Sequence, residues 1–299
     1  MRVYHSDRFQ VPLPPAHRFP MQKYAQLRQA LITSRALSPS ELEEATPIER
    51  EALALVHSAQ YLDAVFSGGL NEAQQRQLGF PWSQELVLRS RASVGGTLAA
   101  ARSALEHGIG GNLAGGTHHS FADRGEGYCV FNDIAVAVRV LQREKAIRRA
   151  VIVDLDVHQG NGTASIFAGD QTVFTFSMHG EHNFPFRKAR SSRDVGLPDD
   201  TGDQAYLEAV SRHLPEVLEA ADADILFYQA GVDPLAEDAL GRLSLSCAGL
   251  RERDRLVLEA ARRRKLPSVL TLGGGYARPI ELSVAAHLGT YLAALETRP

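Results

Sequence analysis

Four short runs of apolar residues in this chain each end at glycine or at charged and polar side chains. The runs occupy residues 149–154, 172–177, 224–229 and 267–272, and they are continuously apolar rather than alternating with polar residues. Continuous runs of this length are typical of strands that are covered on both faces of a sheet. The sequence therefore predicts a buried sheet.

Helix-like stretches lie between these runs. Apolar residues share a helical face over residues 24–31 and 207–218, and more loosely over 250–261. Alternating strands and helices predict an α/β fold, with a parallel sheet that has helices on both sides. No linker divides the chain, so we expect one domain over residues 1–299, with a long loop over 187–203.

Composition excludes several classes of protein. The 32 basic and 35 acidic residues give a net charge of −3, which argues against a protein that binds nucleic acid through its phosphates. No apolar run approaches the roughly 20 residues of a membrane span, and the N-terminus lacks the pattern of a signal peptide. Two cysteines, Cys129 and Cys247, suit a reducing compartment, so we expect a cytoplasmic protein.

Side chains that bind metals follow two of the predicted strands. Asp154, Asp156 and His158 come after one run, and in an extended segment they would share a face. Asp233 follows another run and could reach the same point. Isolated acidic residues at such positions usually cap turns, but a buried group of this kind is costly without a cation. Two carboxylates and an imidazole suit a catalytic zinc, and iron(II) accepts the same ligands.

Two adjacent histidines, His118 and His119, follow a pair of glycines. They could be metal ligands, a proton-transfer pair or polar loop residues. Beside an activated water, two imidazoles would supply a base and an acid near neutral pH. Each would need a partner for its second ring nitrogen, and Asp154 and Asn161 are the candidates.

Further segments have both a structural and a functional interpretation. Residues 273–275 are glycines without the spacing of a phosphate-binding loop, and they would let Tyr276 approach a ligand and donate to an oxyanion. The aromatic segments 125–129 and 183–186 belong either to the core or to the walls of a narrow channel. The basic run 262–265 is interpreted as a solvated face.

With these motifs the chain resembles the zinc-dependent histone deacetylase superfamily, which includes bacterial deacetylase-like, acetoin-utilisation and acetylpolyamine amidohydrolase proteins. The motifs are Gly-Gly-Thr-His118-His119, Asp154-Leu-Asp156-Val-His158-Gln-Gly-Asn161, Ala-Gly-Val-Asp233-Pro and Gly-Gly-Gly-Tyr276. Residues 177–186 are most similar to the class IV-like and bacterial branch. The resemblance spans nearly the whole chain, and it implies an arginase/deacetylase-type fold with zinc at the strand ends.

The resemblance also implies a role for each metal-binding residue. The zinc ligands would be Asp156, His158 and Asp233. Asp154 would help to bind a structural potassium or sodium ion, together with Ser177.

In the same family pattern, His119 would be the general base and then the acid. His118 would be its electrostatic partner, oriented by Asp154. Tyr276 would polarise the acyl carbonyl. Asn161 would hold His119, at a position where many family members have aspartate, so His119 should be less basic here.

The substrate's methylene chain would lie between Tyr128 and Phe184, and the Gly127 carbonyl would accept the scissile amide N–H. Phenylalanine is frequent in the family at the position of Tyr128, and the added hydroxyl would alter chain preference.

The implied reaction is the hydrolytic removal of an acetyl or longer acyl group from an amine such as acyl-lysine. An acylated polyamine or another small acyl-amine is the alternative substrate, and the oligomeric state is not predicted. A ureohydrolase would need a second metal and an aspartate where this chain has Gly160. A binding module without activity is the remaining alternative, and the complete set of motif residues argues against it.

Overall fold

The computed structural model describes residues 1–297, so the last two positions of the expected domain lie outside the described residues. One eight-stranded sheet runs through the protein, with the strand order β2-β1-β3-β8-β7-β4-β5-β6. Neighbouring strands are all parallel. The strands are β1 (Arg2–His5), β2 (Leu42–Glu44), β3 (Ile109–Asn112), β4 (Ala150–Asp154), β5 (Val173–Gly180), β6 (Arg193–Leu197), β7 (Ile225–Gly231) and β8 (Ser268–Gly273).

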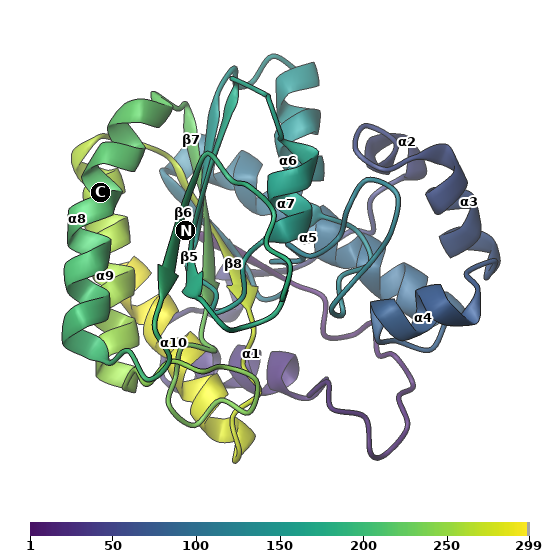
Figure 1. Ribbon diagram of the computed structural model, residues 1–299, viewed down its shortest axis with the longest axis horizontal. Coiled ribbons are helices and arrows are strands. Elements are labelled where there is room, and N and C mark those ends of the chain that lie inside the picture. Colours follow the sequence, from purple (N-terminus) through teal and green to yellow (C-terminus); the bar gives the residue numbers. More distant parts are fainter. Residues whose placement is uncertain (298–299) are drawn as a thin grey trace.

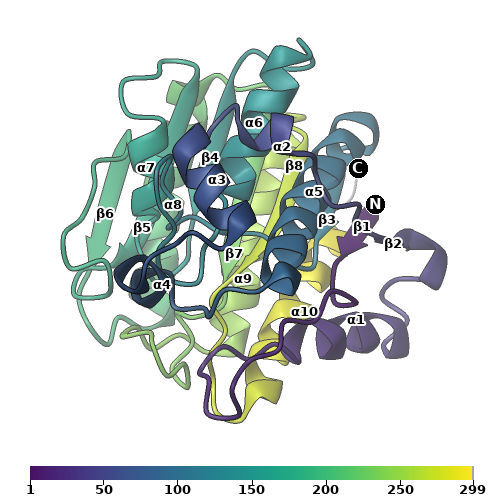
Figure 2. The same ribbon diagram turned by 90° about the vertical axis from the view of Figure 1, so that its right-hand side faces the viewer.

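Helices cover both faces of the sheet (Figure 1). One face carries α1 (Lys23–Thr33), α8 (Asp203–Ala221), α9 (Cys247–Arg263) and α10 (Ile280–Glu296). The opposite face carries α5 (Gln84–His107), α6 (Asp133–Arg143) and α7 (Asn161–Ile166), with α2 (Arg50–Leu53), α3 (Ala59–Ser67) and α4 (Glu72–Leu78) outside them (Figure 2). A 3₁₀ turn, Pro39–Glu41, precedes β2. Within residues 1–297, no helix combines the length and apolar character that crossing a membrane requires.

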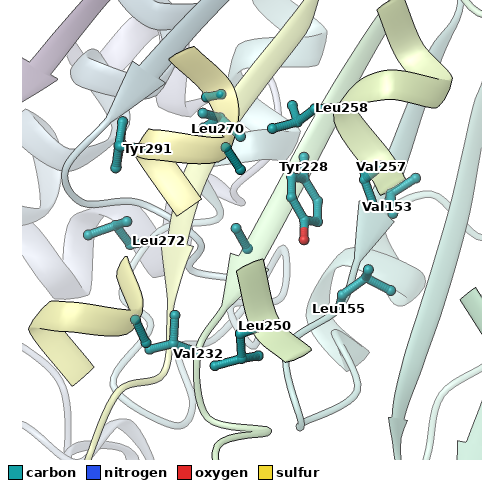
Figure 3. Packing of buried hydrophobic residues seen from close by; sticks show 14 of the residues in the cluster. Val153, Leu155, Tyr228, Val232, Leu250, Val257, Leu258, Leu270, Leu272 and Tyr291 are labelled. Carbon is teal, nitrogen blue, oxygen red and sulfur yellow. The ribbon is translucent and has the colours of Figure 1, made fainter. Parts of the chain in front are cut away.

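The four predicted strands are confirmed, and they form the centre of the sheet as β8, β7, β4 and β5. Every residue of β4, β7 and β8 is buried, as their continuous apolar pattern requires. Side chains from β4, β7 and β8 pack beneath α9 and α10 (Figure 3). A second apolar core fills the space between the sheet and α3, α5 and α6. The expected α/β class is therefore confirmed.

Strands at the sides of the sheet are less visible in the sequence. The stretch 187–203, which we expected to be a loop, contains the edge strand β6. Its residues are mostly half-buried or exposed, because β6 pairs on one side only, and so no apolar run marks it. In β3, position 110 requires glycine because a Cβ there would collide with the Ala100 carbonyl of α5, and so β3 has no continuous apolar run either.

Candidate metal centre and active site

A cavity of about 800 Å³ opens over the carboxyl ends of the central strands. In a parallel sheet these ends meet at one edge, which is where ligands bind in open α/β folds. The segments that follow β3, β4, β7 and β8 all line the cavity. They bring together most of the residues that the sequence singled out, among them His118, His119, Asp156, His158, Asp233 and Tyr276.

Three of the predicted metal ligands converge on one point. Asp156, His158 and Asp233 each offer a ligand atom, and these atoms lie within 4.8 Å of one another. His158 Nδ1 is 2.9 Å from Asp156 Oδ1 and 3.0 Å from Asp233 Oδ2. The Val157 amide donates to the second oxygen of Asp233 at 2.9 Å, which ties the segment after β4 to the segment after β7.

Asp154, Asp156 and His158 do not lie in one extended segment, contrary to the expectation. β4 ends at Asp154, and the chain then bends, so that Asp156 and His158 reach the cavity from a turn. Asp154 instead accepts the Asp156 amide through Oδ1 and faces His118 through Oδ2.

The charges at this point fit a cation. Asp156 and Asp233 are almost completely buried, and burial together with Asp156 raises the pKa of Asp233 to about 7. Burial also disfavours a charged His158, but hydrogen bonds to both carboxylates outweigh it and raise the His158 pKa to about 10. The site therefore attracts positive charge. Two carboxylate oxygens and one imidazole nitrogen are a ligand set that suits a catalytic zinc with an open position.

His118 faces a carboxylate. Its Nδ1 lies 2.7 Å from Asp154 Oδ2, and both side chains are buried. Burial disfavours the imidazolium form, but Asp154 and Asp156 outweigh this effect and raise the pKa of His118 to about 9.

His119 faces an amide. Its Nδ1 lies 2.7 Å from Asn161 Oδ1, and the same oxygen accepts the Gly162 amide at 3.0 Å. The Asn161 Nδ2 group points to Glu126 Oε2 at 3.4 Å, so the amide orientation is defined on both sides. Burial, followed by the charges of His118 and His158, lowers the pKa of His119 well below its ordinary value. Adjacent histidines thus have opposite electrostatic environments.

Tyr276 follows the glycines after β8 and reaches the cavity. Gly274 has φ +53°, and a Cβ at this position would collide with the Asp233 carboxylate, so the close approach requires glycine. Asp238 holds the turn by accepting the Tyr276 amide at 2.7 Å. Burial raises the pKa of Tyr276 well above its ordinary value, which keeps the phenol protonated as a hydrogen-bond donor.

Aromatic side chains and Gly127 form the upper part of the cavity. Tyr128 packs against Phe19 and Phe80, while the Phe184 ring lies 5.0 Å from the His119 ring. Gly127 has φ +54°, and a Cβ there would lie 2.8 Å from His119 Cδ2. The aromatic segments therefore line the cavity, and Tyr128 also packs against the second apolar core.

Ser177 lies on β5 directly beside Asp154 of β4 in the parallel register. Its hydroxyl is 2.9 Å from His179 Nδ1, and both residues are buried. This places the two residues of the expected monovalent cation site next to each other, below the metal centre.

Sequence reasoning missed several residues that support these loops. Asp133 accepts the amides of Gly116 and Thr117 at 3.0 and 2.8 Å and thereby shapes the segment before His118. Lys23, which is buried on α1, donates to the Gly274 carbonyl from behind the tyrosine loop. Gln229 donates to the Gly116 carbonyl at 2.8 Å. Asp133 and Gln229 are polar residues within apolar stretches, which does not indicate their partners, and the sequence around Lys23 has no such pattern.

Comparisons with known proteins identify the family of this chain. The model of the histone deacetylase domain family matches residues 17–291. An uncharacterized protein of Picosynechococcus is 45% identical over 95% of both chains, and histone deacetylase 2 of Arabidopsis thaliana is 33% identical over 87% of this chain and 70% of its own. The crystal structure of a histone deacetylase homologue from Aquifex aeolicus, 24% identical, superposes with a TM-score of 0.85 over all of this chain and 84% of that chain. The fold is the one that the resemblance implied, and the chain belongs to the histone deacetylase family of hydrolases.

Proposed function

We propose that this protein is a zinc-dependent amidohydrolase that removes an acetyl or longer acyl group from an amine, with acyl-lysine as the favoured substrate. The observation that carries the proposal is the convergence of three ligand atoms with two differently partnered histidines and a tyrosine in one cavity. Asp156, His158 and Asp233 would hold the metal. When bound, zinc would supply a Lewis acid that activates water and polarises the acyl carbonyl.

The two histidines would divide the proton transfers. Because its Nδ1 is held by Asn161, His119 presents Nε2 to the cavity and its lowered pKa keeps that nitrogen free to take a proton from the attacking water. His118, held by Asp154, would carry positive charge beside it and stabilise the negative charge that develops. His119 would then return the proton to the leaving amine.

The remaining residues would position the substrate. The Tyr276 hydroxyl would donate to the carbonyl oxygen as charge develops on it. Tyr128 and Phe184 would hold the methylene chain, and the Gly127 carbonyl would accept the amide N–H. Asp154 and Ser177 would help to bind a structural potassium or sodium ion.

The charges that line the cavity are compatible with acyl-lysine as the favoured substrate. Arg76 and Arg242 line the cavity, but each is paired with an acidic side chain, Glu72 and Asp199 respectively. Glu126 is the acidic lining residue outside the metal ligands, so the described lining has no cluster of carboxylates that would select a polycation, and an acylated polyamine is the alternative substrate. The two cysteines form no disulfide, which supports a cytoplasmic location. We also propose that residues 1–299 form one catalytic domain.

The test is a panel of acetyl- and longer acyl-lysine peptides, acetylated polyamines and other small acyl-amines. Each substrate is incubated with the purified protein, with the chelator-treated protein, and after zinc or iron(II) is added back. We expect acyl-lysine hydrolysis that chelation abolishes and metal restores. Hydrolysis that survives complete metal removal, or zinc binding without hydrolysis of any acyl-amine, would contradict the proposal.

A further inference from the structure

A buried ion pair on α9 lies next to the strand ends that carry the metal ligands. Arg253 and Asp254 are neighbours on α9, and both side chains are fully buried. The Arg253 Nε group donates to Asp254 Oδ1 at 2.9 Å. Two charges removed from water are costly unless their remaining hydrogen-bonding groups are also satisfied. The partners of this pair therefore indicate what it does.

Arg253 donates to the backbone at two strand ends. Its Nη1 group lies 2.6 Å from the Gly231 carbonyl and 3.2 Å from the Leu155 carbonyl. Leu155 stands between Asp154 and Asp156, and Gly231 stands two residues before Asp233. One guanidinium group thus joins the backbone beside one carboxylate ligand to the backbone beside the other.

The Leu155 carbonyl lies where β4 has ended and the chain bends toward the cavity. A second side chain, the Tyr206 hydroxyl of α8, also donates to this carbonyl at 3.4 Å. The bend that brings Asp156 and His158 to the metal point is consequently stabilised by side chains from two helices. Arginine suits this task because its planar group presents several fixed donors at once.

Asp254 fixes the arginine in turn. Its two oxygens accept the Tyr228 hydroxyl of β7 at 2.5 Å and the Thr290 hydroxyl of α10 at 2.6 Å. Tyr228 and Leu155 both lie against α9 in the apolar core (Figure 3). The carboxylate is therefore immobilised from the sheet and from a second helix, and it holds the guanidinium group at the strand ends.

We propose that Arg253 is a positioning residue for the metal centre, which sets the spacing of the Asp156 and Asp233 carboxylates by joining the Leu155 and Gly231 carbonyls from α9. This inference rests on the metal site of the proposed function. It assigns the ion pair to ligand geometry rather than to stability. Residues that orient metal ligands typically change affinity by about 10–100-fold when they are replaced.

The test measures zinc affinity by competition with a chromophoric chelator in the full-length protein. Arg253→Met keeps much of the side-chain volume and removes the donors, and we expect it to bind zinc about 10–100-fold more weakly than the wild type. Arg253→Lys keeps the positive charge but loses the planar group with several fixed donors, so we expect an intermediate loss of zinc affinity. Leu62→Ala, on α3 in the other core, is the matched control for lost stability, and its zinc affinity should remain that of the wild type.

Cobalt(II) provides a second readout of ligand geometry. We expect the visible absorption bands of the cobalt-loaded Arg253→Lys protein to shift relative to the wild type, and those of Leu62→Ala to be unchanged. Should Arg253→Met fail to fold, Arg253→Lys and Tyr228→Phe supply the same comparison. Wild-type zinc affinity and cobalt spectra in the folded Arg253 variants would overturn the inference. Activity is not required for either measurement, so wild-type protein that binds zinc but hydrolyses nothing would contradict the proposed function alone.

Discussion

The floor of the cavity differs from its walls. The floor consists of Asp156, His158 and Asp233, which come shortly after two central strands, whereas the walls, Tyr128 and Phe184, lie on longer loops. Asp156 and Asp233 are almost fully buried, the His158 side chain is 12% exposed, and backbone and side-chain hydrogen bonds join the three residues. In the walls, the backbone amide of Tyr128 donates to the Leu78 carbonyl at 2.8 Å, whereas the Tyr128 and Phe184 side chains contact other rings. Their neighbour Phe186 is 85% exposed. The difference separates a part that must be rigid for metal binding from a part that can differ with the substrate.

Removing a floor residue should have the largest effect. Asp233→Ala deletes one carboxylate ligand, and we expect it to lose stoichiometric zinc and to hydrolyse acyl-lysine at least on the order of 10³-fold more slowly, because metal catalysis supplies several kcal/mol. Zinc content by elemental analysis and turnover are the measurements. Asp199→Asn, an acidic residue paired with Arg242 at the surface, is the control and should keep its zinc. If Asp233→Ala kept the full zinc content of the wild type, Asp233 would not be a metal ligand.

Tyr276 joins the two parts, because its loop packs closely on Asp233 at Gly274 and its ring lies 6.1 Å from the Tyr128 ring. Tyr276→Phe should lose about 2–4 kcal/mol of transition-state stabilisation, the contribution of one oxyanion donor. This loss should appear in kcat rather than in zinc content. Tyr128→Phe removes a hydroxyl from the adjacent wall and is the matched control, with little change expected in kcat. Equal turnover by both variants would assign no oxyanion role to Tyr276.

Much of the floor could be predicted from the sequence, because short-range spacing determines it. Buried strands have continuous apolar runs, and polar residues immediately after them reach the same sheet edge. The bend after Asp154 was not predicted, since it depends on Arg253 and Tyr206, which are distant in the sequence. β6 was not predicted either, because an exposed edge dilutes its apolar pattern. In β3, close helix packing requires glycine, so no continuous apolar run marks this strand.

The segment that carries His118 and His119 depends on a neutral histidine elsewhere. His57 Nδ1 donates to the Phe121 carbonyl at 3.0 Å, and its Nε2 accepts the Asn132 amide at 3.1 Å. The protonated ring could not accept that amide. Burial accordingly lowers the pKa of His57 to about 4, against 6.5 for an exposed histidine.

Acid should therefore destabilise the protein through His57. As the pH falls, the unfolded chain binds the proton first. The contribution of His57 to the free energy of unfolding is therefore fully present above pH 6.5, decreases below pH 6.5, and no longer changes below about pH 4. At pH 5 the loss should be about 2 kcal/mol in the free energy of unfolding. Denaturant unfolding at pH 7.5 and at pH 5 measures this difference in the free energy of unfolding. His57→Gln, which cannot titrate, should lose correspondingly less over the same interval, and an identical pH dependence in both proteins would contradict the assignment.

The smallest effect is expected at the outer wall. Phe186→Ala should change the free energy of unfolding by no more than about 0.5 kcal/mol, because the ring is mostly in water. We expect a raised KM for acyl-lysine peptides, which extend past the mouth, and an unchanged KM for a small acyl-amine. If KM rises equally for both substrates, Phe186 contacts the acyl chain itself and belongs with the inner walls.

The most direct test of the metal centre is a crystal structure of the zinc-loaded protein with anomalous diffraction recorded at the zinc edge. The geometry predicts one strong peak at about 2.0–2.2 Å from a carboxylate oxygen of Asp156, Nδ1 of His158 and a carboxylate oxygen of Asp233. A fully loaded crystal with its zinc elsewhere, or with Asp233 turned away from the ion, would contradict it.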